Sequence, residues 1–344
     1  MNYCSLADLN DTIVRNLHGL PRDIDLVVGI PRSGLLAANL FSLVANIPLT
    51  DLDSFLEGQI HTSGATKRHV GLDRGIRDMR RILILDDSIL SGNAMRAARR
   101  RVKDAGIGNR TGAEILFAAV YGSEASHPDA DFILERVSQP RIFQWNFMHH
   151  VVLEESCVDI DGVLCLDPTE QQNDDGEAYR RFLSEAIPLH ATSRRIGYLV
   201  TSRLEKYRTL TEAWLKAQGI EYGQLVMLDL PSKAERQRLG AHSSFKAEFY
   251  RNSAASLFIE SEHEQARAIA RLSGKPVLCV ETHQICLPDR MSPVAMRQQM
   301  RNMPARLKQR AHRSGNRLKG VARGILGDGG YLALKNLVRP QPKG

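Results

Sequence analysis

Apolar residues occur in short continuous runs along the chain, separated by longer segments in which they recur every three or four positions. Runs of this kind predict buried strands, and the longer periodic segments predict amphipathic helices. The predicted strands are residues 26–30, 82–85, 115–120, 151–158, 196–200, 225–228, 256–259 and 276–280. The predicted helices are residues 35–44, 93–104, 206–218 and 264–272. This alternation favours an α/β architecture with mostly parallel sheets.

Two segments interrupt the alternation. Residues 61–78 are polar and Gly-rich, and they form a longer stretch than a simple connection needs, which is typical of functional loops. Residues 138–150 read as a connection between domains. We therefore expect two doubly wound parallel-sheet domains, residues 1–145 and 150–288, followed by a basic helical or disordered tail at 289–344.

The charge of the chain is unevenly distributed. The 344 residues carry a net charge of +7, with 43% hydrophobic and 25% charged residues, as in a soluble globular protein. From Arg290 to the end there are 13 Lys and Arg against one acid, Asp328, so the rest of the chain has a net charge of −5. The folded body therefore gives no reason to expect a nucleic-acid binder.

Targeting signals and paired cysteines are not evident in the sequence. The first residues lack the basic flank and apolar core of a signal peptide, and no apolar run is long enough to span a membrane. The five cysteines are scattered without CxxC spacing, which predicts free thiols in a reducing compartment. Two of them, Cys157 and Cys279, lie in apolar runs and are expected in the core. We therefore expect a cytoplasmic protein.

The segment RILILDDSILSGNAM, residues 81–95, carries the first candidate chemistry. An apolar strand is followed by Asp86 and Asp87, at the strand end where a crevice opens in a parallel sheet. The turn at residues 88–94 then offers amide and hydroxyl groups at a helix N-terminus, which suits a phosphate. Two carboxylates beside a phosphate site suit a phosphorylated ribose. The alternative is that these polar residues only cap the helix at 93–104.

An earlier segment, DLVVGIPRSGLLAA at residues 25–38, has the pattern of a strand, a tight turn and a helix. It lies roughly 50 residues before the acid pair. The polar stretch TSGATKRHVG, residues 62–71, follows it. Its cations are either ligands of a charged substrate or ordinary loop residues.

Together these segments resemble the type I phosphoribosyltransferases over about residues 20–135. The resemblance implies binding of phosphoribosyl pyrophosphate (PRPP), with pyrophosphate leaving C1 of the ribose through an oxocarbenium-like state while Mg²⁺ and Arg32 neutralise the leaving diphosphate. Asp86 and Asp87 would orient the ribose and favour the developing positive charge. Ala94 departs from the family, which usually has Thr or Ser there. The residues implied in PRPP binding are Arg32, Ser33, Gly34, Lys67, Arg68, Ser88, Ser91, Gly92 and Asn93.

The segment VVLEESCVDIDGVLC, residues 151–165, carries the second candidate chemistry. It is an apolar run that ends in DxDG, so Asp159 and Asp161 are expected on the same side of an extended chain end, with Gly162 freeing the turn. One acid can attack phosphorus while the other protonates the leaving oxygen. The pair also offers a site for Mg²⁺.

This pattern resembles the first motif of the haloacid dehalogenase superfamily, and later motifs follow in order over about residues 150–285. The resemblance implies that Thr201 holds the transferring phosphoryl group and that Lys246 stabilises its charge, with Lys233 as the alternative lysine. Glu in place of the commoner Asp in the last motif is a departure. The implied metal ligands are Asp159, Asp161, Glu260 and Glu262.

About 30 residues separate DxDG from the strand that carries Thr201. They are too few for a large cap domain. We therefore expect a phosphatase domain with little or no cap, whose open site admits large or polymeric phosphoesters.

The C-terminal tail places Met296, Met300, Met303 and Leu307 at near-helical spacing among many cations. A basic amphipathic helix indicates peripheral contact with a membrane surface. The alternatives are a solvated or disordered tail and a nucleic-acid-binding arm.

Two domains of this kind on one chain suggest a shared substrate. The first would transfer ribose 5-phosphate from PRPP to an acceptor, and the second would remove the 5-phosphate. The pair resembles bacterial PRPP-dependent ribofuranosyltransferase and phosphatase modules of surface polysaccharide synthesis, which implies a glycan or lipid-linked glycan acceptor at the inner face of the cytoplasmic membrane. The alternatives are a nucleotide-metabolism phosphoribosyltransferase, acting on an orotate- or purine-like base and fused to a phosphatase, and a non-catalytic PRPP-sensing regulator.

Overall fold

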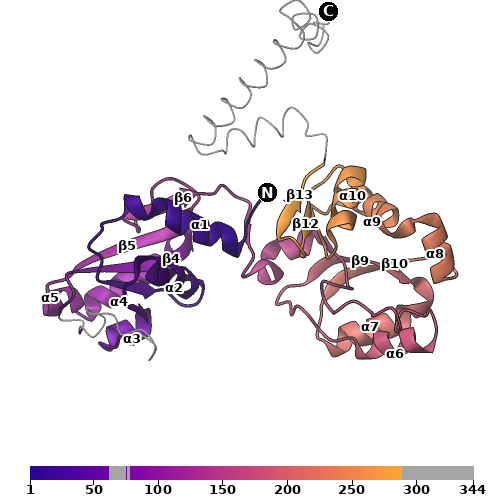
Figure 1. Cartoon of the computed structure of the whole chain (residues 1–344), viewed down its shortest axis with the longest axis horizontal. Helices are drawn as coiled ribbons and strands as arrows, with labels where there is room; N and C mark the ends of the chain where they lie inside the picture. Colours follow the sequence, from indigo (N-terminus) through magenta and orange to yellow (C-terminus); the bar gives the residue numbers. More distant parts are fainter. Residues whose placement is uncertain (62–74, 76–77, 289–344) are drawn as a thin grey trace, which may run out of the picture. The chain divides into compact units, whose positions relative to one another are not determined.

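The computed structural model describes residues 1–61, 75 and 78–288. Two mainly parallel sheets, each flanked by helices, account for most of these residues (Figure 1). The mixed α/β architecture expected from the apolar pattern is confirmed.

The N-terminal sheet has five strands in the order β3-β2-β4-β5-β6, and all of its strand pairs are parallel. Its strands are β2 (Leu26–Gly29), β3 (Leu49–Asp51), β4 (Arg81–Ile89), β5 (Glu114–Gly122) and β6 (Phe132–Arg136). The helices of this region are α1 (Leu6–Asn16), η1 (Leu17–Gly19), α2 (Ser33–Ala45), α3 (Leu52–Leu56), α4 (Asn93–Asp104) and α5 (Ile107–Thr111).

Both faces of this sheet are buried. Val28 and Ile84 belong to a hydrophobic cluster that includes buried residues of α3 and α4. Their neighbours Val27 and Leu83 belong to a second cluster, with buried residues of α1 and α2. Strands buried on both faces read as continuous apolar runs, which is why the central strands were recognisable in the sequence.

Residues 138–150 are more structured than a simple connection. They contain β7 (Arg141–Phe143), which pairs in parallel with β1 (Asn2–Cys4), and the turn η3 (Phe147–His149). The predicted strand at 151–158 is wrong over its first five residues, which form the 3₁₀ turn η4 (Val151–Glu155). His150 caps this turn by accepting a hydrogen bond from the backbone N–H of Val152, a local interaction that competes with strand formation.

The C-terminal sheet has six strands in the order β10-β9-β8-β11-β12-β13. Only the edge pair between β12 and β13 is antiparallel. The strands are β8 (Ser156–Val158), β9 (Ile196–Leu204), β10 (Tyr222–Leu228), β11 (Leu257–Glu260), β12 (Val277–Cys279) and β13 (Gln284–Cys286). The helices are α6 (Glu177–Glu185), η5 (Glu205–Tyr207), α7 (Arg208–Ala217), α8 (Lys233–Leu239), α9 (Ala241–Asn252) and α10 (His263–Ser273).

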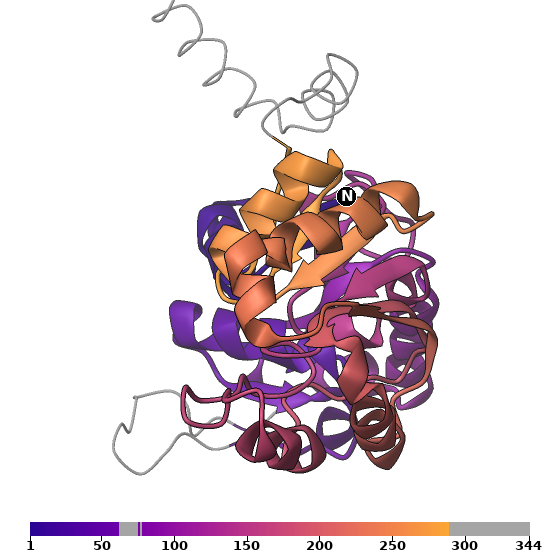
Figure 2. The ribbon, with the colours of Figure 1, turned by 90° about the vertical axis from the view of Figure 1, so that its right-hand side faces the viewer.

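Helices cover both faces of this sheet as well. Figures 1 and 2 show α9 and α10 (orange) on one side and α6 and α7 (pink) on the other. Val158 and Leu199 pack in the cluster that includes residues of α6 and α7, whereas Cys157 and Val200 pack with residues of α9 and α10. Each sheet therefore lies between two hydrophobic layers of its own, as in doubly wound folds.

Two strands extend further than their apolar runs predict. Asp86, Asp87 and Ser88 lie inside β4, because β5 continues the backbone pairing as far as Ile89. Thr201 likewise lies inside β9, which continues to Leu204 and pairs there with Leu228. Both strands continue through polar residues because their backbones are hydrogen-bonded to a neighbouring strand. This pairing cannot be predicted from the local sequence.

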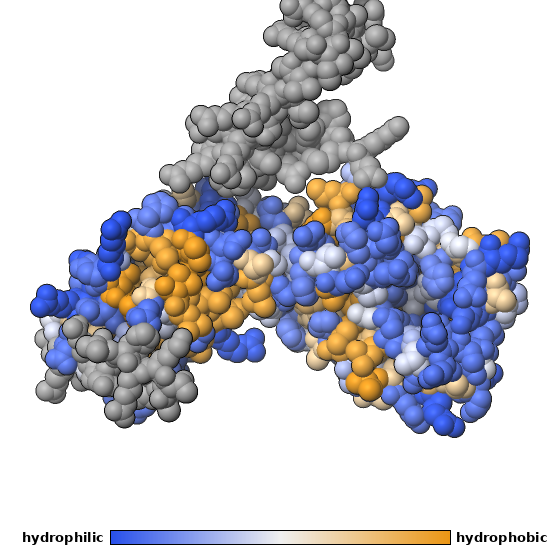
Figure 3. Space-filling view, viewed as in Figure 1, coloured by the Kyte–Doolittle hydropathy of each residue, from blue (hydrophilic) through white to orange (hydrophobic). Residues whose placement is uncertain are grey.

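All five cysteines are free, as predicted, and Cys157 and Cys279 are fully buried. Among the described residues, no helix has the length and apolar character needed to cross a membrane. Figure 3 shows an apolar area where Figure 1 labels α2, a helix on which Leu43 and Val44 are 72% and 41% exposed.

Candidate functional sites

The strand order of the N-terminal sheet reverses at β2, the position at which open α/β sheets have a crevice at their carboxyl ends. Because β3 and β4 pair with opposite sides of β2, the connections that follow β2 and β4 diverge at their carboxyl ends. Helix α2 begins at this point with Ser33, preceded by the exposed Arg32. A side chain on Gly34 would place its Cβ only 2.8 Å from the carbonyl oxygen of Leu85 and 2.9 Å from Oδ1 of Asp86. The start of α2 therefore packs directly on the acid pair.

Asp86 and Asp87 are both buried, at 8% and 4% exposure. Oδ1 of Asp86 accepts a hydrogen bond from the backbone N–H of Asp87 at 2.9 Å. Burial, reinforced by the neighbouring Asp87 carboxylate, raises the pKa of Asp86 to about 8. The pair therefore suits a ligand that brings hydroxyl donors or a cation to the crevice.

Asp87 is held from two sides. Its Oδ1 accepts a hydrogen bond from Oγ of Ser33 and its Oδ2 from Nε1 of Trp145, each at 2.8 Å. Trp145 stacks on Phe143, which stacks on Tyr121, with ring centroids 4.8 and 5.5 Å apart. The sequence did not single out Trp145. This residue lies in the segment predicted to connect the two domains, and an isolated aromatic residue there is part of no helix or strand pattern.

The predicted phosphate turn, residues 88–94, overlaps the end of β4. Gly92 directly precedes α4, whose first residue is Asn93, and Ser88 lies one residue before the end of β4. The carbonyl oxygen of Ser91 accepts a hydrogen bond from Nη2 of Arg96 at 3.1 Å, and the same Arg96 nitrogen lies 2.7 Å from Oδ2 of Asp129. Of the residues expected to bind PRPP, Lys67 and Arg68 lie outside the described residues.

The C-terminal sheet has its own crevice, beside β8. The strands β9 and β11 pair with opposite sides of β8. Asp159 directly follows β8, Thr201 lies in β9 and Glu260 is the last residue of β11. The strand order thus brings together three residues that are widely separated in the sequence.

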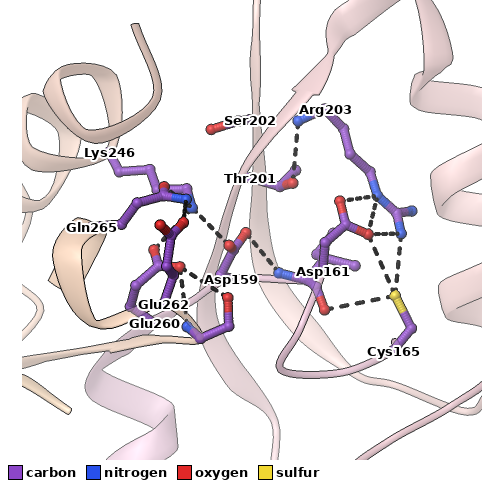
Figure 4. A network of polar contacts seen from close by, with 12 residues as sticks. Asp159, Asp161, Cys165, Thr201, Ser202, Arg203, Lys246, Glu260, Glu262 and Gln265 are labelled. Atoms are coloured by element: carbon purple, nitrogen blue, oxygen red, sulfur yellow. Dashed lines mark hydrogen bonds and ion pairs between the residues drawn. The ribbon is translucent and has the colours of Figure 1, made fainter. Parts of the chain in front are cut away.

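Lys246 of α9 joins two of these acids (Figure 4). Its Nζ lies 2.6 Å from Oδ2 of Asp159 and 2.8 Å from Oε2 of Glu260. All three side chains are at most 6% exposed. The alternative lysine, Lys233, donates instead to the carbonyl oxygen of Asn173, so Lys246 is the lysine that the fold brings to the acids.

The cluster of Asp159, Glu260 and Lys246 holds two carboxylates and one ammonium group. The pKa of Asp159 is raised to about 8. Burial and the negative charge of Glu260 raise this pKa by more than the positive charge of Lys246 lowers it. Although burial opposes the charge of Lys246, the two carboxylates raise the pKa of that lysine. Carboxylate oxygens are the donors that Mg²⁺ prefers, and a divalent cation would compensate the excess negative charge. This cluster therefore offers Mg²⁺ two carboxylate donors, both of which contact Lys246.

The four predicted metal ligands are not assembled into one group. Within residues 1–61, 75 and 78–288, no three His, Cys, Asp or Glu side chains are arranged to hold a metal ion. Glu262 is exposed at the start of α10 and accepts a hydrogen bond from Nε2 of Gln265 at 2.6 Å. Asp159 and Glu260 converge on Lys246, whereas Glu262 is linked to Lys246 only through Gln265, and Asp161 is paired with Arg203.

Asp161 points away from Lys246, toward Arg203 (Figure 4). Nη2 of Arg203 lies 2.6 Å from Oδ1 of Asp161, and Nε lies 3.1 Å from Oδ2. The expectation that Asp159 and Asp161 face the same side is wrong, because β8 ends at Val158 and the strand alternation does not apply beyond it. Although burial opposes its charge, Asp161 raises the pKa of Arg203, which is fully buried.

Sequence reasoning missed Arg203 and Asp167. Arg203 lies two residues after Thr201 on the same strand, and period-two spacing could have placed both on one face. The backbone N–H of Arg203 donates to Oγ1 of Thr201 at 3.2 Å. Asp167 lies close to Gly162, and burial, with the charges of Asp161 and Glu260, raises its pKa. No sequence spacing distinguished Asp167 from an ordinary surface acid.

With this geometry in place, the comparison with protein families becomes informative. Residues 5–152 match the family described as phosphoribosyl transferase domain. This part of the chain is a phosphoribosyl transferase domain. Such a domain implies transfer of a phosphoribosyl group from PRPP. The match extends beyond Trp145, so the hydrogen bond between Trp145 and Asp87 lies within the phosphoribosyl transferase domain.

Solved structures similar to this chain include two phosphoribosyltransferases. A purine phosphoribosyltransferase from Pyrococcus horikoshii is 22% identical, with 42% of this chain and 94% of that chain covered and a TM-score of 0.28. The Helicobacter pylori xanthine-guanine-hypoxanthine phosphoribosyltransferase is 14% identical, with 42% and 92% covered and a TM-score of 0.30.

A chain of the Pnkp1/Rnl/Hen1 complex is similar over a longer stretch. It is 14% identical, with 77% of this chain and 97% of that chain covered and a TM-score of 0.24. At TM-scores this low, none of these structural similarities bears on the activity of the chain. No curated protein matches it significantly.

Proposed function

We propose that this chain is a bifunctional ribofuranosyltransferase. Its phosphoribosyl transferase domain would transfer ribose 5-phosphate from PRPP to an acceptor, and its C-terminal α/β domain, residues 150–288, would then remove the 5-phosphate. The observation that carries the second half is the contact of Lys246 with Asp159 and Glu260 at the carboxyl edge of the six-stranded sheet. A buried carboxylate held in this way suits a nucleophile of the haloacid dehalogenase type.

In the transfer step, the bond between C1 of the ribose and the pyrophosphate oxygen breaks, and a bond from C1 to an acceptor oxygen forms. The acceptor hydroxyl loses its proton, and pyrophosphate leaves. Asp86 and Asp87 would accept hydrogen bonds from the ribose hydroxyls, while the turn at Ser91 and Gly92 would hold the 5-phosphate. Ser33 and Trp145 fix the Asp87 carboxylate before the substrate arrives, which reduces the ordering needed on binding.

In the phosphatase step, an oxygen of Asp159 attacks phosphorus and the bond to the ribose O5 breaks. The leaving oxygen takes a proton from Asp161, which enters this step as the protonated acid and becomes the carboxylate that pairs with Arg203. Water then attacks the aspartyl phosphate, Asp161 accepts the proton of that water, and inorganic phosphate and free Asp159 result. Arg203 would position Asp161 through hydrogen bonds from its Nε and Nη2. Oγ1 of Thr201 would hold the transferring group.

Mg²⁺ belongs to this proposal. Bound at Asp159 and Glu260, it would neutralise charge on the phosphoryl oxygens. It would also favour the ionised, nucleophilic form of Asp159, which burial and Glu260 disfavour. The side chain of Asp161 is engaged by Arg203 and is therefore assigned to proton transfer, not to the metal.

We further propose that the acceptor is a glycan or lipid-linked glycan at the inner face of the cytoplasmic membrane. Two features support this. A short segment between Asp161 and β9, with α6 as its helix, would leave the phosphatase site open to a large substrate. The tail from Arg290 to the end, with a net charge of +12, suits an anionic membrane surface.

The decisive experiment is the mass of the product made by the Asp159→Asn variant. With PRPP, Mg²⁺ and a glycan acceptor, this variant should release pyrophosphate and yield the acceptor plus ribose 5-phosphate, heavier by one phosphate than the wild-type product. Adding an Asp87→Asn variant, whose phosphatase site is unchanged, should convert that product to the ribosylated acceptor. A fully dephosphorylated product from Asp159→Asn alone would contradict the sequence of steps. Transfer to a free base but to no glycan would favour a nucleotide-metabolism enzyme.

A further inference from the structure

Arg236 of α8 is a buried cation that the proposed phosphatase step does not yet use. It is 7% exposed. Its Nη1 donates a hydrogen bond to the carbonyl oxygen of Ser202 at 2.7 Å. Ser202 directly follows Thr201 in β9, so this bond ties a guanidinium group to the strand that carries the proposed phosphoryl-binding hydroxyl.

Two buried polar atoms at this place have no protein partner. Nε of Arg236 and Oγ of Ser202 make no hydrogen bond to any residue that the structure describes. Ser202 and Arg203 leave β9 on opposite sides, and Ser202 points to the side of Lys246 (Figure 4). An unpaired buried donor is costly, and such groups are usually satisfied by a ligand or by water.

The charge of Arg236 also influences two neighbouring titratable residues, His242 and Tyr179. On one side, burial together with Arg236 and Lys246 lowers the pKa of His242 to about 4. On the other side, burial and Asp161 raise the pKa of Tyr179, whereas Arg203 and Arg236 oppose that rise. The charge of Arg236 therefore acts on His242 on one side and on Tyr179 on the other.

The other cations of this crevice are already neutralised. Lys246 contacts two carboxylates, and Arg203 is paired with Asp161. Among the ion pairs formed by the described residues, none includes Arg236. A phosphomonoester that enters the crevice brings up to two negative charges. Arg236, which has no carboxylate partner among the described residues, is available to neutralise them.

We propose that Arg236, with Oγ of Ser202, binds the phosphoryl group of the substrate beside Thr201. This inference rests on the proposed phosphatase function. The planar guanidinium matches phosphate oxygens in a way that a lysine ammonium cannot, because it offers two parallel N–H donors. The ligand class is a phosphomonoester, or inorganic phosphate as its product.

The test measures phosphate binding and hydrolysis separately in the full-length protein with Mg²⁺. Orthophosphate is titrated by isothermal calorimetry into wild type, Arg236→Ala and Arg236→Lys, and hydrolysis of p-nitrophenyl phosphate is followed in parallel. The matched control is Arg238→Ala, on the same helix, where the arginine is exposed and paired with Glu235. Arg236→Lys keeps a charge and a donor for Ser202, so it guards against loss of folding, which circular dichroism checks.

The orthophosphate Kd should rise about tenfold in Arg236→Ala, as expected for a lost charge-assisted hydrogen bond, and less in Arg236→Lys. KM should rise in parallel with a smaller change in kcat, and Arg238→Ala should match wild type. Unchanged phosphate binding in both Arg236 variants would overturn the inference while an active wild type upheld the phosphatase. Arg236-dependent binding without any hydrolysis would support the anion site and contradict the phosphatase. A wild type that neither binds nor hydrolyses would contradict both.

Discussion

The guanidinium of Arg203 donates hydrogen bonds to both oxygens of the Asp161 carboxylate. The two side chains differ in their exposure to water, which is 0% for Arg203 and 20% for Asp161. Loss of either partner leaves the other unpaired. An unpaired Asp161 can be hydrated, whereas an unpaired Arg203 cannot. The two halves of this ion pair should therefore contribute unequally to stability.

We predict that Asp161→Ala lowers the free energy of unfolding by about 3–5 kcal/mol, as is typical when one partner of a buried pair is removed. Arg203→Met should lower it less, and the double variant should be more stable than Asp161→Ala alone. Urea denaturation followed by circular dichroism measures all three. Equal effects of the two single changes would contradict the role assigned to burial.

The acid pair of the phosphoribosyl transferase domain should act independently of the phosphatase site. We predict that Asp87→Asn abolishes pyrophosphate release from PRPP. The substitution removes the negative charge of the carboxylate that Ser33 and Trp145 orient by hydrogen bonds and that we place at the ribose site. Asp86→Asn should have a weaker effect. Hydrolysis of p-nitrophenyl phosphate, measured on the same preparations, should match wild type. Loss of both activities in a folded variant would argue against two separate sites.

The raised pKa of Asp86 makes a prediction about pH. In the folded protein the pKa of Asp86 is about 8, against 3.8 for an ordinary aspartate, so between these values the folded state holds a proton that the unfolded state has released. Raising the pH through this window therefore lowers stability, and the loss from this group is complete above about pH 8. The unfolding free energy of Asp86→Asn, measured without ligands from pH 4 to pH 9, should fall less steeply than that of wild type. Parallel pH profiles would show that Asp86 is not protonated in the folded state.

Close packing of α2 on β4 gives a prediction about glycine. A Cβ on Gly34 would lie 2.8 Å from the carbonyl oxygen of Leu85, a backbone atom that cannot easily move. Gly34→Ala should therefore destabilise the protein by about 1–3 kcal/mol and impair PRPP-dependent transfer. Gly19→Ala is the matched control, because nothing lies within 4 Å of its added carbon. Denaturation midpoints compare the two variants, and equal midpoints would refute the close contact.

The basic tail should govern contact with membranes. We predict that deleting residues 291–344 weakens binding to anionic lipid vesicles, since each Lys or Arg near such a surface contributes about 1 kcal/mol. Vesicle co-sedimentation at low and high salt measures this, with neutral vesicles as the control. Equal binding of the full-length and shortened proteins at low salt would count against a membrane role.

The apolar runs were sufficient to predict the central strands, because residues such as Val28, Ile84, Val158 and Leu199 are buried in continuous stretches. The polar ends of strands were not predictable in this way. Asp86 and Thr201 are part of strands only because neighbouring strands pair with the backbone around them, a contact between distant segments. β1 and β7 escaped notice for the same reason, since each has three residues and pairs across most of the N-terminal region.

In the candidate sites, too, local features were predictable from the sequence and contacts between distant segments were not. Residues in contiguous motifs, such as Asp159 and Asp86, were predictable from the sequence. Their partners were not: Trp145, Asp167 and Arg236 reach the sites through the path of the chain, and none has a distinctive spacing. The direction of Asp161 was predicted incorrectly because the rule of alternating side chains was extended past the end of β8.

Each crevice lies where the strand order reverses, so its existence depends on the path of the chain and not on the acids that line it. During evolution, substitution of Asp86 or Asp159 could therefore abolish chemistry and still leave the reversal of strand order in a folded domain. Descendants of such a protein would be positioned to become ligand sensors. Conversely, a sensor with the same strand order could gain catalysis through a few carboxylates, which would make enzymes and regulators on this architecture close evolutionary neighbours.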